Sequence, residues 1–182
     1  MKPGDVTLFS GGARGAEAAF GAVAEAHGVA QVNYTFLGHE VVRSSDSVSL
    51  SDEELARGDV SMAEVSRRLH RDYSTRPWMR RILQSIWHQV NSGHQVFVVG
   101  EILGNATVKG GTGWAVELGK VYSRPLSVFD PVCSAWFAWR DGAWVEDVPR
   151  IDHPTVCGTG TRDLNEAGRR AIQDLFARSF GA

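Results

Sequence analysis

The chain has 182 residues, the length of one ordinary domain, and its core needs no disulfide or metal to be stable. Its 19 Lys and Arg and 21 Asp and Glu residues give a net charge of −2, which argues against a dedicated duplex-DNA-binding protein because such proteins carry a basic excess. Cys133 and Cys157 lack metal-ligand spacing and no apolar run is long enough for a membrane helix, so we expect one cytoplasmic domain over residues 1–182 without membrane contact.

The first part of the chain predicts a strand, a helix and a second strand. Apolar or alternating runs indicate the strands, and an alanine-rich segment that ends at Gly28 indicates the helix. The expected elements are a strand over 6–9, a helix over 15–27 and a strand over 31–37. Residues 38–60 are polar and lack periodicity, apart from Ser51 to Glu54, which form a capping box that begins a short helix.

The middle of the chain predicts two longer helices and a buried strand. Ser61 with Glu64 repeats the capping pattern and predicts a helix to about Tyr73. Pro77 begins a helix over 77–90, which has the strongest three- and four-residue apolar periodicity in the sequence. The run 95–102 is apolar throughout, as expected for a central strand of a parallel sheet with both faces covered.

The last part of the chain alternates strands and helices again. The expected elements are a helix over 114–122, a strand over 126–129, a hairpin of 136–139 with 143–145, a strand over 155–157 and a helix over 164–180. Trp139 and Trp144 are expected to face each other across the hairpin. The whole order predicts an α/β, Rossmann-like three-layer sandwich, with a mostly parallel sheet of about five strands, helices on both faces and an added β-hairpin.

Three glycine-rich turns follow predicted strands and precede predicted helices. They are Ser10-Gly11-Gly12-Ala13-Arg14-Gly15, Gly110-Gly111-Thr112-Gly113 and Gly158-Thr159-Gly160-Thr161-Arg162. Helix N-termini offer unpaired N–H groups to anions, and glycine lets the backbone approach a ligand closely. Because such turns meet at the carboxyl edge of a parallel sheet, we expect them to form one phosphate-binding site, with Arg14 and Arg162 adding charge. None of the turns matches the dinucleotide fingerprint or the P-loop.

The second turn resembles the P-G-G-x-G-T-x-x-E motif of the Lonely Guy (LOG) nucleotide phosphoribohydrolases. In Gly110-Gly111-Thr112-Gly113-Trp114-Ala115-Val116-Glu117 the glycines and Glu117 fall in register. The first turn with Glu17 and the third turn are similar to signatures of a bacterial and phage branch of the wider SLOG superfamily, which includes the DNA-processing protein A domain. The resemblance covers most of the chain except residues 38–75. It implies a Rossmann-like domain that binds a nucleotide-like small molecule, without a cofactor or a metal.

The same resemblance implies candidate catalytic residues. In LOG enzymes the motif glutamate works with an arginine from an earlier helix at the N-glycosidic bond, which points to Glu117 with either Arg80 or Arg81. Lys109 and Trp114 depart from the proline and threonine of the motif. LOG-like folds usually pair through helices beside the site, so we expect a homodimer with the helix 78–90 as its surface. Glu17, in the first turn of its helix, is expected to bond ribose hydroxyls.

Three functions remain open at this point. The first is a binding protein or sensor for a nucleotide or a nucleotide-derived ligand, and the second is a LOG-like enzyme acting at the N-glycosidic bond of nucleoside monophosphates. The third is a single-stranded nucleic-acid binder, for which an arginine cluster over 67–81 and the tryptophans at 136, 139 and 144 are candidates. The negative net charge disfavours this third function.

Overall fold

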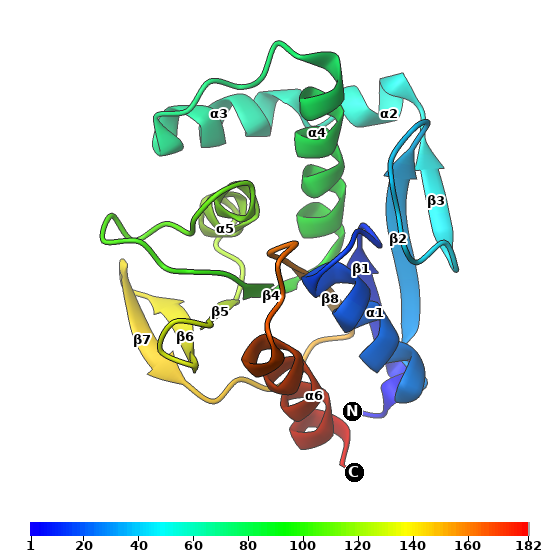
Figure 1. Cartoon of the computed structure of the whole chain (residues 1–182), viewed down its shortest axis with the longest axis vertical. Coiled ribbons are helices and arrows are strands. Elements are labelled where there is room, and N and C mark those ends of the chain that lie inside the picture. The colour runs from blue at the N-terminus through cyan, green and yellow to red at the C-terminus, as the bar shows by residue number, and fades with distance from the viewer. Residues whose placement is uncertain (182) are drawn as a thin grey trace.

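The computed structural model describes residues 1–181, and within them eight strands form one mixed sheet in the order β3-β2-β1-β8-β4-β5-β6-β7 (Figure 1). Ala182, the last residue of the predicted domain 1–182, lies outside the described residues. The strands are β1 (Thr7–Ser10), β2 (Ala30–Phe36), β3 (Ser47–Leu50), β4 (Gln95–Val99), β5 (Leu126–Asp130), β6 (Ala135–Arg140), β7 (Ala143–Asp147) and β8 (Thr155–Gly160). The strands from β3 to β5 along this order pair in parallel, whereas β6 and β7 add an antiparallel edge.

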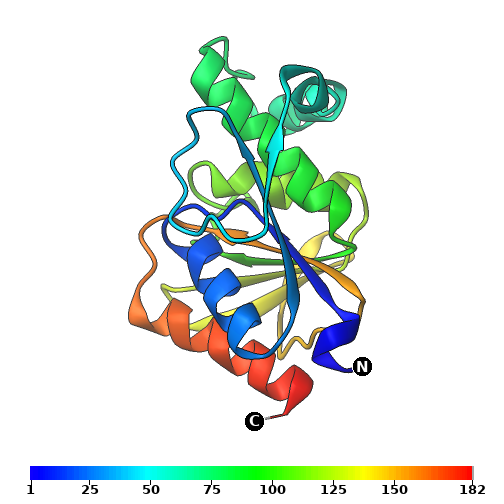
Figure 2. The same ribbon diagram turned by 90° about the vertical axis from the view of Figure 1, so that its right-hand side faces the viewer.

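Helices cover both faces of the sheet, as the views in Figures 1 and 2 show. They are a 3-10 turn η1 (Pro3–Asp5), α1 (Ala16–Ala26), α2 (Asp52–Ala56), α3 (Asp59–Leu69), α4 (Pro77–Ser92), α5 (Thr112–Val121) and α6 (Glu166–Phe180). Helices α1 and α6 pack on one face, while α4 and α5 pack on the other and α3 lies on α5. The predicted α/β three-layer sandwich is confirmed.

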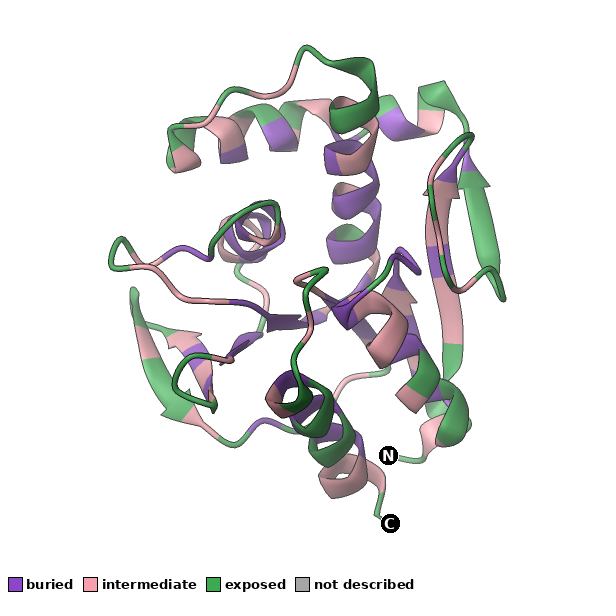
Figure 3. Cartoon of the chain, in the orientation of Figure 1, coloured by how far each residue is buried: buried purple, intermediate pink, exposed green. Residues whose placement is uncertain are grey.

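Alternation along the central strand β4 divides the core between these two layers. Phe97 and Val99 belong to the apolar cluster under α1 and α6, whereas Val96 and Val98 belong to the cluster under α4 and α5. All four residues are at most 1% exposed, and Figure 3 shows the buried residues concentrated along the central strands and the sheet-facing sides of the helices. A strand covered on both sides explains the unbroken apolar run in the sequence.

The structure differs from the predicted elements in several places. Strand β4 ends at Val99 rather than at residue 102. The stretch 38–60 contains an additional edge strand, β3, in which Leu50 is the single buried residue. Helix α3 begins at Asp59, because Ser61 bonds the Tyr122 hydroxyl at 2.7 Å instead of capping the helix, and it ends at Leu69, where His70 has a left-handed backbone conformation. Glycines 158 and 160 lie within β8 rather than after it, and α6 begins later, at Glu166.

The position of β8 marks a reversal in the order of the strands. From β1 the chain builds the sheet outward through β2 and β3, whereas from β4 it builds in the opposite direction through β5. Strand β8 returns at the end of the chain and fills the gap between β1 and β4. Open parallel sheets bind ligands at the carboxyl ends of strands around such a reversal. In the described part of the chain, no helix is both long and apolar enough to cross a membrane.

Candidate functional site

A cavity of about 620 Å³ lies at the carboxyl ends of β1, β8 and β4. All three predicted turns and one face of α4 contribute to its lining. The lining residues are Ala13, Arg14, Glu17, His39, Trp78, Met79, Ile82, Ser85, Ile86, Gln89, Gly100, Glu101, Lys109, Gly110, Gly111, Thr112, Ala115, Pro131, Thr159, Gly160, Thr161, Arg162 and Asp163. We call this space the main cavity. Its size is in the range of small-molecule sites.

The predicted binding residues divide into those that line the main cavity and those that shape it from behind. Arg14, Glu17, Gly110, Gly111, Thr112, Thr159, Gly160, Thr161 and Arg162 line it, whereas Ser10, Gly11, Gly12, Gly15, Gly113 and Gly158 do not. Ser10 is fully buried and donates a 2.7 Å hydrogen bond to the Gly158 carbonyl, which ties the first turn to β8. A Cβ at Gly15 would lie 2.3 Å from the Thr161 carbonyl oxygen, so this glycine lets the first and third turns touch.

The turn before α5 has the features of an anion-binding backbone. The backbone N–H groups of Gly110, Gly111 and Thr112 have no hydrogen-bond acceptor among the described residues. Arg71 donates a 2.7 Å hydrogen bond to the Gly110 carbonyl and holds the turn in place. Gly111 has an ordinary φ of −63°, and a Cβ there would meet nothing within 4 Å. No contact inside the protein therefore requires glycine at 111, whereas close approach of a ligand would.

Cationic side chains stand at the edge of the main cavity. Arg14 pairs with Asp163 at 3.3 Å, with both side chains mostly exposed, and Lys109 pairs with Glu101 at 2.8 Å. Arg162 forms no ion pair within residues 1–181. Exposed ion pairs contribute about 0–1 kcal/mol to stability. These cations are therefore able to exchange their present partners for a ligand anion at little cost.

The floor of the main cavity carries Glu17. Its Oε2 accepts a hydrogen bond from the Ala13 N–H at 3.1 Å and its Oε1 accepts one from the Thr159 hydroxyl at 3.0 Å. Gln89 from α4 lies beside it. A Cβ added at Gly11 would be 2.6 Å from Gln89 Nε2 and 2.7 Å from Glu17 Oε2, so both groups border the same space. The absent side chain of Gly11 thus lets the carboxylate and the amide come together.

Burial decides the acidity of this carboxyl group. Removal from water raises the pKa of Glu17 above its ordinary value. The hydrogen bonds from Ala13 and Thr159, the charge of Arg162 and the amide of Gln89 oppose this shift without cancelling it. Burial and the charge of Arg162 also lower the pKa of His39, which favours its neutral form at the opposite wall. The carboxylate therefore faces the cavity from a poorly solvated position.

The wall made by α4 is apolar and aromatic near the opening. Trp78 and Met79 are 43% and 44% exposed in the first turn of α4. His39 stacks on Phe36 with ring centroids 4.7 Å apart, and its ring lies 6.2 Å from that of Trp78. Partly exposed rings therefore line the same cavity as the turn before α5.

Glu117 lies outside the main cavity. It lines a second cavity of about 330 Å³ together with Thr107, Lys120 and Trp139. Its Oε1 accepts a 2.8 Å bond from Lys120 Nζ, with both side chains about one-tenth exposed, and the ammonium lies 3.8 Å from the centre of the Trp139 ring. The expected direction of Glu117, toward a ligand bound at the glycine turn, is not observed.

The helical period explains this difference. Thr112 and Ala115 of α5 line the main cavity, and Glu117 is about 200° around the helix from Ala115. Glu117 does share a side with Gly113, but a Cβ at Gly113 would meet the Val108 carbonyl oxygen at 2.4 Å and Thr107 Oγ1 at 3.4 Å. That side faces the loop before α5. Trp114 also lies away from the main cavity and is packed against Tyr73.

The arginine candidates Arg80 and Arg81 do not line either cavity. Arg80 bonds Asp59 at 2.8 Å, and Arg81 pairs with Asp52 at 2.9 Å. Both therefore connect α4 to the neighbouring α3 and α2. The structure does not bring either of them to Glu117 or to the glycine turns.

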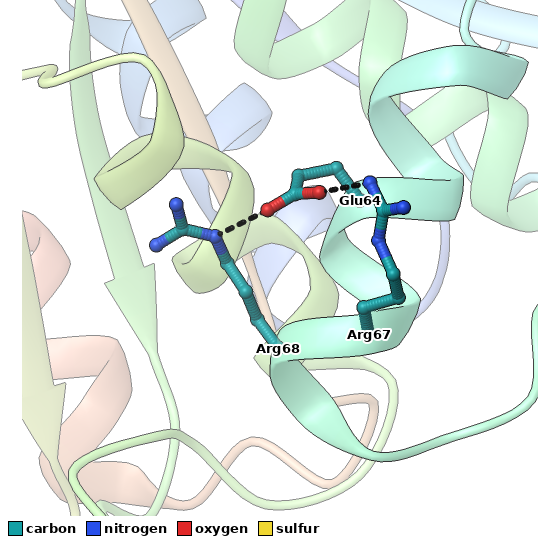
Figure 4. Close-up of polar contacts among 3 residues, drawn as sticks. All are labelled: Glu64, Arg67 and Arg68. Atoms are coloured by element: carbon teal, nitrogen blue, oxygen red, sulfur yellow. Dashed lines mark hydrogen bonds and ion pairs between the residues drawn. The ribbon is translucent and has the colours of Figure 1, made fainter.

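The features proposed for nucleic-acid binding are used within the protein. Arg67 and Arg68 both pair with Glu64 on α3, as Figure 4 shows. Trp139 and Trp144 face each other across the β6–β7 hairpin, as predicted, with ring centroids 5.0 Å apart, and Lys120 covers them. Trp136 is buried against Phe97 and Phe129. These basic and aromatic side chains thus have partners within the protein, whereas the side chain of Arg76 forms no hydrogen bond or ion pair with the described residues.

Metal and thiol chemistry find little support in the described residues. Residues 1–181 contain no group of three or more His, Cys, Asp or Glu side chains arranged to hold a metal. Cys157 is fully buried, and burial raises the pKa of its thiol far above the ordinary value. Cys157 is therefore a small core residue beneath α4.

Sequence reasoning expected Arg80 or Arg81 of α4 at the site and missed the residues of this helix that do line it. Its apolar periodicity pointed to a core or dimer surface, but Ser85 and Gln89 are 1% and 2% exposed and line the main cavity. The signal is present in the sequence as polar residues on the apolar side of the helix. Buried polar side chains are costly unless they have a function or a partner, and Gln89 Oε1 has no partner among the described residues.

The comparisons with known proteins gave no match to a family model, to a curated protein or to a solved structure. The geometry of the main cavity is therefore the observation that bears on function.

Proposed function

We propose that this protein binds a phosphorylated, nucleotide-like small molecule in the main cavity, as a binding protein or sensor. The observation that carries the proposal is the meeting of the three glycine turns at one cavity, with three N–H groups of the turn before α5 lacking an acceptor among the described residues. A phosphate on these groups would gain hydrogen bonds and the positive end of the α5 dipole. Lys109, Arg14 and Arg162 would add charge from the edge.

The remaining walls suit the rest of such a ligand. Trp78, Met79 and His39 offer flat or apolar surface for a base, and Glu17 offers a carboxylate to a sugar. The cavity also has enough volume for a molecule of this size. The main cavity thus has an end with backbone N–H groups for an anion, an aromatic wall and an acidic floor. This combination supports a nucleotide over a simple inorganic anion.

The proposal is tested by thermal unfolding with a panel of nucleoside 5′-monophosphates and inorganic phosphate. A ligand at 100 times its dissociation constant adds about 2.7 kcal/mol to the free energy of unfolding, which raises the melting temperature by several degrees. We expect at least one monophosphate to give such a shift. No shift with any member of the panel would contradict the proposal.

A matched pair of variants locates the site. Gly111→Asp places a carboxylate at the expected phosphate position without a clash, since a Cβ at 111 has open space, and it should weaken binding about tenfold or more. Gly104→Asp adds the same charge on the same loop at another glycine with open space, outside the main cavity. Binding by Gly104→Asp should match that of the unchanged protein. Equal binding by Gly111→Asp would remove this turn from the site.

A LOG-like hydrolase of nucleoside monophosphates is the second candidate, and Glu17 is the observation that favours it. Glu117 lies outside the main cavity, whereas Glu17 is a carboxylate on its floor without an ion-pair partner among the described residues. Carboxylates at such positions stabilise charge or activate water in glycoside cleavage. Release of free base, followed by chromatography, separates the candidates: release that Glu17→Gln abolishes supports the hydrolase, and bound but unaltered ligand supports the binding protein.

A further inference from the structure

The polar floor of the main cavity has hydrogen-bonding capacity that the protein leaves unused. Glu17 Oε1 accepts one hydrogen bond, from the Thr159 hydroxyl, although a carboxylate oxygen has room for about two, whereas Oε2 accepts from the Ala13 N–H and has the Gln89 amide beside it. Gln89 is 2% exposed, and its Oε1 has no hydrogen-bond partner among the described residues. The Glu17 carboxylate and Gln89 Oε1 can therefore each accept a further hydrogen bond.

Several elements of the fold contribute residues to this floor. Glu17 comes from α1, Thr159 from β8 and Gln89 from α4. Gly11 has no side chain and leaves the space in which Glu17 and Gln89 approach each other. Thr159 is 4% exposed, and its hydroxyl donates a hydrogen bond to Glu17. The carboxylate is therefore held in one orientation by neutral donors, while its remaining acceptor positions stay available to a ligand.

We infer that Glu17 and Gln89 recognise the vicinal hydroxyl groups of a ribose, so that the main cavity selects ribonucleotides over deoxyribonucleotides. The inference rests on the proposed function, because it assumes that a phosphate is anchored at the turn before α5. A hydroxyl group both donates and accepts, so it satisfies the carboxylate and either atom of the Gln89 amide. Two vicinal hydroxyls match a carboxylate and a neighbouring amide, whereas a deoxyribose leaves one of these two groups without its ligand partner.

The size of the selection follows from the chemistry of the floor. A hydrogen bond to a charged group contributes more than one between neutral groups, and a site that loses its partner keeps the desolvation penalty. We therefore expect a ribonucleoside 5′-monophosphate to bind about tenfold or more tightly than the 2′,3′-dideoxy compound with the same base. The 2′-deoxy compound should lie between the two.

The experiment is titration calorimetry of the whole chain with these three compounds and with inorganic phosphate. Equal affinity for the ribo and dideoxy compounds would overturn this inference and leave the proposed function intact. Binding by none of the compounds or by phosphate alone would overturn both. The comparison is made within the unchanged protein, so it does not depend on whether a variant folds.

Two variants assign the selection to residues. Glu17→Gln keeps the volume and removes the charge, and Gln89→Met keeps the length and removes the amide, so each should reduce the ribo-to-dideoxy ratio toward one. Glu25→Gln makes the same chemical change on α1 at a side chain that is 67% exposed and pairs with Arg43, and it should leave the ratio unchanged. A full ratio in Glu17→Gln would overturn the role of this carboxylate.

Discussion

Two glutamates, one on each of two sheet-packed helices, have different partners. Glu117 on α5 is buried beside Lys120, which neutralises it at 2.8 Å beneath the rings of Trp139 and Trp144. Glu17 on α1 is held by an N–H group and a hydroxyl and has no ion-pair partner among the described residues. A carboxylate paired with its own cation serves the fold, whereas one held by neutral donors and facing a cavity remains available to a ligand.

The largest effect that this contrast predicts is on stability. Lys120→Met leaves Glu117 as a buried charge without its partner, which typically costs about 3–5 kcal/mol. We expect the free energy of unfolding, measured by urea denaturation, to fall by about 3 kcal/mol. Arg67→Met breaks an exposed ion pair with Glu64 and should change it by less than about 1 kcal/mol.

A double variant shows whether the loss comes from the unpaired charge. Glu117→Leu with Lys120→Met removes both charges together, and such apolar replacements of a buried pair are often close to neutral. The double variant should therefore regain most of the stability that Lys120→Met loses. A double variant as unstable as the single one would mean that packing of the Lys120 chain on the tryptophans, rather than its charge, stabilises this region.

The next effect compares two glycines near the main cavity. Gly11→Ala places a Cβ 2.6 Å from Gln89 Nε2 and 2.7 Å from Glu17 Oε2, and overpacking of this kind costs about 1–3 kcal/mol. Gly111→Ala meets open space at an ordinary φ and should stay within about 0.5 kcal/mol of the unchanged protein. Thermal unfolding of both variants checks the difference. A neutral Gly11→Ala would show that the floor is loosely packed.

The sequence was informative about the fold wherever burial imposes a pattern. The apolar run of β4 and the periodicity of α4 are direct consequences of being covered, and the glycine turns indicated the correct edge of the sheet. Strand β3 was missed because three of its four residues are exposed, so it has neither an apolar run nor a buried face that alternates. Its pairing with β2 depends on backbone hydrogen bonds, which leave little trace in the side chains.

The site was predictable in its backbone and less so in its side chains. Glycines 110 and 111 could be assigned from their place before a predicted helix, and both line the main cavity. The direction of Glu117 depended on which side of α5 faces the cavity, and Gly113, the reference for that direction, faces Thr107 instead. Gln89 comes from a helix that is distant in sequence from Glu17 and Thr159. Its place on the floor is recognised only in the structure, in which β8 places Thr159 between β1 and β4. The predicted homodimer stays a prediction.

The smallest effect is the pH dependence that Glu17 should impose on stability. Burial raises the pKa of Glu17 in the folded protein above its ordinary value of 4.5. Between these two values the folded protein binds more protons than the unfolded chain, so the free energy of unfolding falls as the pH rises through this window and stays lower above it. Glu17→Gln does not titrate at this position, so its stability relative to the unchanged protein should increase as the pH rises from 4.5.

Glu54 provides a control of opposite sign on another helix. Hydrogen bonds with the backbone and the side chain of Ser51 lower the pKa of Glu54, so its contribution is present above pH 4.5 and is lost as the pH falls through its folded-state pKa. The stability of Glu54→Gln relative to the unchanged protein should therefore decrease as the pH rises toward 4.5. Urea denaturation between about pH 3.5 and pH 8, in steps of about half a pH unit, measures both differences. Curves of the same sign would show that Glu17 is no more desolvated than a surface carboxylate, and the contrast between Glu17 and the neutralised Glu117 would then lose its electrostatic basis.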